Sequence, residues 1–147
     1  MAKIEVIVGT TLGGAEYVSD ELISILTEQG HETEQHLTPD LGALNTSNLW
    51  LLVSSTHGAG ELPDNIQPFH RQILEQKPDL TAVKFAACSI GDSSYDTFCE
   101  GPELLIKSFQ QLGAKEIVNK IQIDVQQEEL PEDTAINWLE SWKDQIL

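Results

Sequence analysis

Short apolar runs alternate along this chain with longer stretches whose apolar residues recur every three or four positions. Runs rich in β-branched and large apolar residues, bounded by glycine, proline or polar residues, are typical of strands. The run LWLLVS is apolar enough for a central strand that is buried on both faces. We therefore expect five strands, over residues 4–8, 33–37, 49–54, 83–90 and 116–125.

The stretches between these runs have the spacing of amphipathic helices. The first helix should follow Gly13 and Gly14 and end at Gly30, and the others should lie between Pro63 and Pro78, before Gly113, and after Pro131. The apolar positions that we expect on the core faces are Ala15, Val18, Leu22, Ile25 and Leu26; Phe69, Ile73 and Leu74; Leu104, Leu105, Phe109 and Leu112; and Ile136, Leu139, Trp142 and Ile146.

Strands that alternate with helices predict an α/β domain, with a parallel sheet and helices on both faces. The length suits one domain over residues 1–147. In an open parallel sheet the ligand lies outside the carboxyl ends of the strands, where the strand order reverses. The loops after the first, third and fourth strands are therefore the candidate site, and they have the least ordinary sequences.

The first of these loops reads GTTLGGAE, over residues 9–16. Glycines let the backbone approach a ligand, free amides at a helix start attract an anion, and Thr10 and Thr11 add hydroxyl donors. No Lys or Arg lies between Lys3 and Arg71, so backbone dipoles and hydroxyls alone would hold a phosphate here. The loop is neither a P-loop nor a G-x-G-x-x-G fingerprint. A tight turn with a helix cap is the alternative.

The second and third loops, residues 54–65 and 89–99, are too polar to pack as core. His57 can stack, hydrogen-bond or titrate near neutral pH, or it is an ordinary loop residue. Tyr95 can lie against a flat ring, with loop packing as the alternative. We expect Phe98 to support the core, Cys99 to offer a backbone N–H, and Cys88, within an apolar strand, to be structural.

Together the three loops resemble those of flavodoxins, in the right order and at the ends of the right strands, and the resemblance covers the whole chain. The most specific motif is Gly91-Asp92-Ser93-Ser94-Tyr95 with Phe98 and Cys99; Ser55-Thr56-His57-Gly58 and Thr10-Thr11-Leu12-Gly13 match the other two loops. The chain lacks the long insertion of long-chain flavodoxins, so it resembles the short-chain type. The resemblance implies a flavodoxin-like five-stranded parallel sheet in the order 2-1-3-4-5.

The resemblance also implies flavin mononucleotide (FMN) as a non-covalent cofactor. Backbone and hydroxyl groups of the first two loops would hold its phosphate, Tyr95 would stack on the isoalloxazine, and the Gly58 carbonyl would accept from N5–H of the reduced ring. Main-chain groups of Thr56, Asp92 and Cys99 would contact the polar edge of the ring. The candidate cofactor-binding residues are Thr10, Thr11, Leu12, Gly13, Gly14, Ala15, Ser55, Thr56, His57, Gly58, Gly91, Asp92, Tyr95, Phe98 and Cys99.

Three positions depart from the common flavodoxin pattern. Leu12 and Ala15 stand where threonines that contact the phosphate are usual. Each missing hydroxyl removes roughly 1 kcal/mol of binding, so we predict weaker FMN binding than in a typical flavodoxin. His57 stands where an aromatic residue, often Trp, covers the inner face of the ring. We hypothesise that protonation of His57 is coupled to reduction of the flavin.

The formal net charge of −16 limits which classes of partner the protein can bind. It excludes nucleic acid and anionic membrane surfaces and favours basic proteins, although acidity also keeps small proteins soluble. We expect docking of a flavin reductase and of an iron–sulfur or haem acceptor with basic faces, and a monomer, with a weak dimer as the alternative. The acidic side chains near the predicted site are Glu61, Asp64, Asp92, Asp96, Glu100 and Glu103.

The two cysteines fit reduced thiols in a cytoplasmic protein, and we expect neither a signal peptide nor a membrane span. The predicted function is electron transport, in which Asp92 and Asp96 oppose a negatively charged reduced ring. It requires no catalytic nucleophile and no metal. An FMN-binding regulatory or accessory module is the alternative. A receiver domain would need an acceptor Asp where Ser54 and Ser55 stand, and a hydrolase lacks its G-x-S-x-G.

Overall fold

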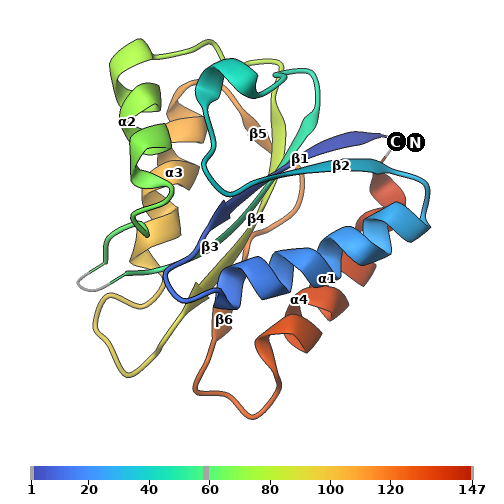
Figure 1. Ribbon diagram of the computed structural model, residues 1–147, viewed down its shortest axis with the longest axis vertical. Helices are drawn as coiled ribbons and strands as arrows, with labels where there is room; N and C mark the ends of the chain where they lie inside the picture. Colours follow the sequence, from blue (N-terminus) through green and yellow to red (C-terminus); the bar gives the residue numbers. More distant parts are fainter. Residues whose placement is uncertain (1, 58–59, 147) are drawn as a thin grey trace.

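The computed structural model describes residues 2–57 and 60–146. All of its paired strands run parallel, in the order β2-β1-β3-β4-β5, with β6 pairing β4 farther along (Figure 1). The predicted α/β fold and its strand order are therefore confirmed. The strands are β1 (Lys3–Gly9), β2 (Glu32–His36), β3 (Leu49–Ser55), β4 (Lys84–Gly91), β5 (Lys115–Glu116) and β6 (Ile121–Asp124).

The fifth predicted strand, residues 116–125, is wrong as a continuous element, because the structure divides it into β5 and β6. Glu116 pairs with Phe85 and Ile121 pairs with Cys88, so the edge chain advances five residues while β4 advances three. The two extra residues bulge out of the ladder. There the indole Nε1 of Trp138 donates to the carbonyl of Asn119 at 3.1 Å.

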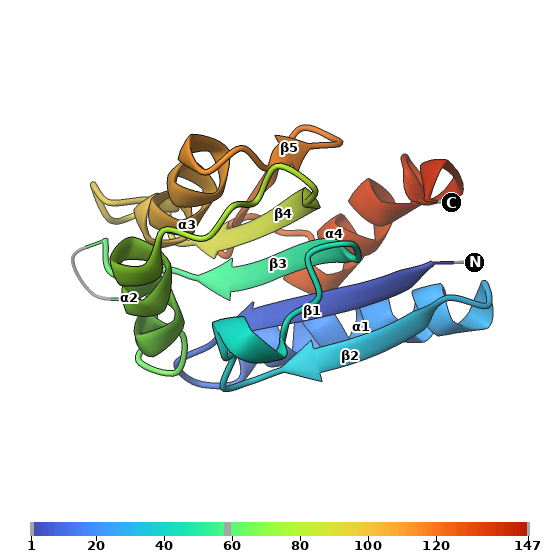
Figure 2. The ribbon, with the colours of Figure 1, turned by 90° about the horizontal axis from the view of Figure 1, so that it is seen from above.

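Helices cover both faces of the sheet, as the sequence predicts. Helices α1 and α4 lie on one face, and α2 and α3 lie on the other (Figure 2). Two short 3₁₀ helices complete the chain. The helices are α1 (Gly14–Glu28), η1 (Leu41–Ala43), α2 (Gln67–Gln76), α3 (Glu100–Gln111), α4 (Pro131–Glu140) and η2 (Lys143–Gln145).

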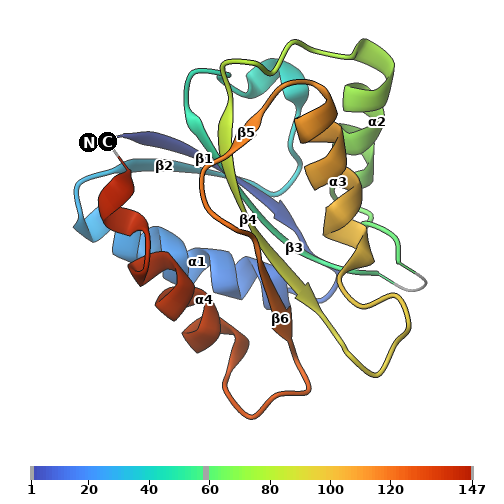
Figure 3. The same ribbon diagram turned by 180° about the vertical axis from the view of Figure 1, so that it is seen from behind.

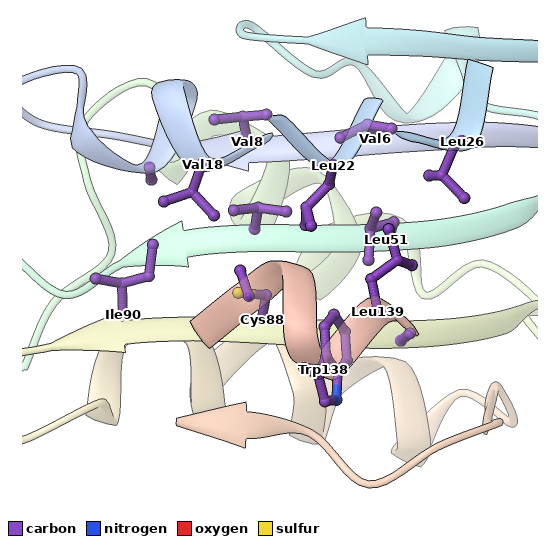
Figure 4. Close-up of a cluster of buried hydrophobic side chains, with 14 of the residues drawn as sticks. Val6, Val8, Val18, Leu22, Leu26, Leu51, Cys88, Ile90, Trp138 and Leu139 are labelled. Carbon is purple, nitrogen blue, oxygen red and sulfur yellow. The ribbon is translucent and has the colours of Figure 1, made fainter. Parts of the chain in front are cut away.

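The core has one layer on each side of the sheet. Figure 4 shows the first layer, in which Val18, Leu22 and Leu26 of α1 pack over the strands beside Trp138 and Leu139 of α4. The spacing predicted in the first helix is thus confirmed at its buried positions. The second layer is an aromatic cluster with edge-to-face contacts, built from Trp50, Phe69, Phe85 and Phe109.

Two predicted core positions are wrong. Leu74 of α2 is 52% exposed and Leu104 of α3 is 43% exposed. Each directly neighbours a fully buried residue, Ile73 or Leu105, that faces the sheet. One turn of a surface helix buries only a narrow stripe, so one of two adjacent apolar residues points away from the sheet.

The carboxyl ends of β1, β3 and β4 lie at one end of the sheet, and Figure 3 shows the arrowheads of β4 and β6 pointing to it. The chain termini lie at the opposite end. The three loops singled out by the sequence therefore meet on one edge of the molecule.

Candidate functional site

A cleft of about 520 Å³ opens at this carboxyl edge. Among the described residues of the predicted site, most line it, and Gly13, Gly91 and Cys99 do not. Gly58 lies outside the described residues. The predicted residues that line the cleft are Thr10, Thr11, Leu12, Gly14, Ala15, Ser55, Thr56, His57, Asp92, Tyr95 and Phe98.

The loop between β1 and α1 ends in open amides. Gly13 precedes the helix with φ +90°, a left-handed conformation that glycine adopts without strain, and no side chain caps the helix. Thr10 Oγ1 instead accepts from the Gly13 amide at 2.9 Å. The first amides of α1 therefore face the cleft end without side-chain acceptors, which is the geometry that binds an anion.

Asn65 holds this loop in place. Its Oδ1 accepts from the Thr10 amide at 2.9 Å, and its Nδ2 donates to the carbonyls of Val8 at 2.7 Å and Leu37 at 2.8 Å. One side chain thereby joins the end of β1, the end of β2 and the segment after β3. Sequence reasoning did not assign Asn65 a role, since an Asn in a polar loop gives no sign of contacts so distant in the sequence.

The ends of β1 and β3 and the loops that follow them make two further contacts. Thr11 Oγ1 lies 3.4 Å from His57 Nδ1, and Ser55 Oγ donates to the Gly9 carbonyl at 3.4 Å. The backbone of His57 exchanges hydrogen bonds with Glu61, at 2.7 and 2.9 Å. His57 therefore lies at the cleft, with Nδ1 of its ring toward Thr11 of the loop after β1.

Two carboxylates hold the loop after β4. Asp92 accepts from the hydroxyl and amide of Ser94, at 2.6 and 2.9 Å, and these bonds keep the pKa of Asp92 below its usual value. Asp124 accepts from the amides of Ser93 and Gln126, and the bonds from Ser93 above all lower its pKa. Both side chains stay ionised well below neutral pH, and Asp92 places a negative charge in the wall of the cleft.

Tyr95 projects from this loop with 62% of its surface exposed and lines the cleft together with Phe98. Beneath them, Gly91 approaches Cys99 so closely that an added Cβ would lie 2.8 Å from the Cys99 amide nitrogen. Cys99 is fully buried and precedes α3 with φ +57°. These two residues thus shape the loop from below, and the exposed ring of Tyr95 is available to a planar ligand.

A fourth wall of the cleft was not predicted from the sequence. It comes from α1 and from the segment between β6 and α4, where Tyr17, Val18, Val125, Pro131 and Glu132 line the cleft. Glu21 and Glu132 raise the pKa of the Tyr17 hydroxyl. The available signal was Val125 and Pro131, which follow the end of a strand at the same edge of the sheet. Ile90 and Thr97 also line the cleft.

The acidic side chains that the sequence analysis placed near the site differ in whether they form an ion pair. Glu61, Asp64, Asp96 and Glu100 are exposed, whereas Glu103 forms an ion pair with Lys120. Within the acidic cluster expected from the sequence, the charge of Glu103 is thus offset by a lysine.

Both cysteines are free thiols. Cys88 is fully buried, and burial raises the pKa of its thiol far above the usual range, as expected for a structural cysteine. Within residues 2–57 and 60–146, no helix combines the length and the apolar character that crossing a bilayer requires.

Comparison with known proteins points to one family. The model of the Flavodoxin family matches residues 6–138. Protein MioC of Escherichia coli K12 is 47% identical over 142 residues, which cover 97% of each chain. Flavodoxin YqcA of Pectobacterium carotovorum is 33% identical, over 99% of this chain and 98% of that one. A solved single-residue mutant of flavodoxin from Pseudomonas aeruginosa superposes with a TM-score of 0.88 at 32% identity, covering 98% of both chains.

Proposed function

The chain belongs to the flavodoxin family, and on that premise we propose that it binds FMN in the cleft and carries electrons one at a time between protein partners. One observation supports this most: open helix amides and an exposed tyrosine belong to the same cleft, on the loops after β1 and β4. When bound, FMN supplies one- and two-electron redox chemistry, and the protein chain sets its position and electrostatics.

The phosphate seat would be the start of α1. Its uncapped amides and the hydroxyls of Thr10, Thr11 and Ser55 are donors, and the helix dipole favours a negative charge there. Because no Lys or Arg occurs from residue 4 to residue 70, this seat relies on neutral donors. Gly13 and Gly14 would contribute backbone contacts.

The ring seat would lie between the loops after β3 and β4. The side chain of Tyr95 would stack on one face of the isoalloxazine, with Phe98 beside it and His57 toward the other face. Main-chain groups of Thr56, Asp92 and Cys99 would meet the polar edge, and the Gly58 carbonyl would accept from N5–H.

The charges around this seat oppose any negative charge that reduction adds. Asp92 and Asp124 are ionised and fixed by hydrogen bonds, and Asp96 is exposed on the same loop. Their repulsion would disfavour a negative charge on a flavin bound in this seat. This is the property that a one-electron carrier requires.

The partners would be a flavin reductase and an iron–sulfur or haem acceptor. The acidic side chains of Glu61, Asp64, Asp96 and Glu100 support docking of basic faces around the cleft. The free thiols fit the cytoplasm as its place of action, and we propose that it acts there as a monomer.

Apolar Leu12 and Ala15 at the phosphate seat favour a second candidate, an FMN-binding regulatory or accessory module that holds flavin loosely. Photoreduction separates the two. A carrier loaded with FMN should be photoreduced and then reoxidised rapidly by a basic haem protein, whereas a regulatory module should transfer no electrons to it.

The binding step is tested by titrating FMN with the flavin-free protein and following flavin fluorescence and visible absorption. Wild type should quench the flavin fluorescence with one-to-one stoichiometry. Tyr95→Ala should bind at least several-fold more weakly, since base–aromatic stacking contributes about 1–3 kcal/mol. Leu74→Ala removes an exposed apolar side chain from α2, outside the cleft, and should bind like wild type. Absence of saturable binding by wild type would contradict the proposal.

A further inference from the structure

Away from the cleft, two carboxylates and an imidazole converge on one face of the sheet. Glu5 lies in β1 and pairs in register with Glu34 of β2, and His36 follows two residues later on the same face. His36 Nε2 lies 2.7 Å from Glu5 Oε1 and 3.8 Å from Glu34 Oε2. One ligand atom from each residue lies within 4.8 Å of the other two. We call these three residues the β1–β2 triad.

Glu5 is unusual because it is only 2% exposed, at a position of a central strand where apolar residues are expected. Its second oxygen accepts from Asn48 Nδ2 at 2.9 Å and from the Asn45 amide at 3.3 Å. Its first oxygen, Oε1, lies toward Nε2 of His36. These contacts fix the orientation of the buried carboxylate, with Oε1 toward His36.

The charge of the triad is not balanced by the protein. Among the ion pairs of the described residues, Glu5 and Glu34 have His36 as their sole partner. A protonated imidazole would offset one of the two carboxylates and leave one negative charge beside a buried anion. A doubly charged cation would compensate both carboxylates, and a buried carboxylate such as that of Glu5 requires charged or hydrogen-bonding partners.

We propose that the β1–β2 triad binds a divalent transition-metal ion of the zinc type, through Glu5 Oε1, Glu34 Oε2 and His36 Nε2. Zinc takes imidazole nitrogen and carboxylate oxygen at about 2.0–2.2 Å, which places tetrahedral ligand atoms about 3.4 Å apart. The observed separations of 2.7 and 3.8 Å lie on either side of that value. Imidazole Nε2 donates its lone pair, and any hydrogen on that atom leaves to solvent.

The surroundings suit entry and retention of an ion. The Glu34 side chain is 58% exposed on the edge strand, so it opens the site to solvent and leaves a fourth position for water. Asn48 and the Asn45 amide act as outer contacts that orient Glu5, as the groups behind the ligands do in known metal sites. None of the three ligands lines the cleft, so this site is separate from the proposed flavin seat.

The test is a calorimetric titration of the flavin-free full chain with zinc chloride, using Glu34→Gln, His36→Gln and the control Glu32→Gln. Glu32 is an exposed glutamate of the same strand, opposite Lys3 and outside the triad. Wild type and Glu32→Gln should bind one zinc ion with equal affinity. Glu34→Gln and His36→Gln should bind at least tenfold more weakly.

Thermal unfolding gives a second measurement, because an ion that binds the folded state alone raises the midpoint. Zinc should raise the midpoint of wild type and of Glu32→Gln and leave that of Glu34→Gln nearly unchanged. The exposed Glu34→Gln variant keeps the test decisive even where His36→Gln fails to fold. Absence of one-to-one zinc binding by wild type, or equal affinity in Glu34→Gln and Glu32→Gln, would overturn the proposal.

Discussion

The hydroxyl of Thr11 lies 3.4 Å from Nδ1 of His57, and this contact joins the loop after β1 to the loop after β3 across the cleft. A hydroxyl can donate to or accept from an imidazole, so the contact suits either tautomer of the ring. It holds the ring of His57 at the wall of the cleft, beside the proposed flavin seat.

We predict that His57→Phe flattens the pH dependence of the midpoint potential of the FMN-loaded protein around neutral pH. Imidazole changes charge in this range and phenylalanine does not. Thr11→Val is the matched control, since it removes the contact but keeps the imidazole, and it should retain most of the slope. Potentiometric titrations at several pH values give the slopes. Equal slopes for wild type and His57→Phe would contradict the proposed coupling.

Leu12→Thr should tighten FMN binding about fivefold, since one added hydroxyl hydrogen bond contributes about 1 kcal/mol. Leu12 is 96% exposed, so the replacement removes no packing. The control Leu74→Thr makes the same exchange at an exposed position of α2 and should leave the affinity unchanged. Fluorescence titration measures both. A sub-nanomolar dissociation constant for wild type would disprove the weak binding that motivates this variant.

Charge reversal near the cleft should slow electron transfer to a basic haem protein. Asp96→Lys and Glu61→Lys each replace an exposed negative charge with a positive one and should lower the association rate several-fold at low salt. Glu28→Lys, an exposed change at the far end of α1, should have little effect. Stopped-flow rates that stay constant as ionic strength rises would show that no electrostatic steering occurs.

Gly91→Ala should destabilise the protein by about 1–3 kcal/mol, the usual cost of overpacking. Its new Cβ would lie 2.8 Å from the Cys99 amide nitrogen and 3.1 Å from Phe98 Cδ1, so the loop after β4 must shift. Gly14→Ala adds a Cβ with no atom within 4 Å and should be neutral or stabilising. Urea denaturation measures the two differences. An unchanged midpoint for Gly91→Ala would show that this loop adapts freely.

Acid should destabilise the fold through His31. Burial lowers the pKa of His31, and its Nδ1 accepts from the Ala2 amide at 2.9 Å, so the folded state favours the neutral ring. The unfolded chain binds the proton more readily, and stability is therefore lost as pH falls below about 6.5. His31→Asn keeps an acceptor but does not titrate, so its free energy of unfolding should fall less between neutral and mildly acidic pH. Equal losses in both proteins would contradict this prediction.

Most of the fold could be predicted because its signals are local. The apolar spacing of α1 is confirmed at Ala15, Val18, Leu22 and Leu26, which are all buried. The break between β5 and β6 could not be predicted, since two extra residues in an edge strand depend on how the neighbouring strand and α4 pack. Periodicity describes one segment at a time and contains no information on register.

The candidate site, too, could be predicted only in part. The rule that ligands lie at the carboxyl edge of a parallel sheet identified three of the loops that line the cleft. It did not identify Tyr17 and Glu132, whose place in the cleft depends on α1 and α4 packing side by side. The carboxylate of Asp124 was missed for a similar reason, because its bond to Ser93 spans 31 residues.

The three bonds of Asn65 to Thr10, Val8 and Leu37 have a consequence for how fast a ligand can be captured. They order the loop after β1 in the ligand-free chain, so little conformational entropy remains to be lost when an anion arrives. Association would then be limited by diffusion and desolvation and not by folding of the loop. A protein whose loop is less ordered would bind the same ligand with a lower association rate, even at equal equilibrium affinity.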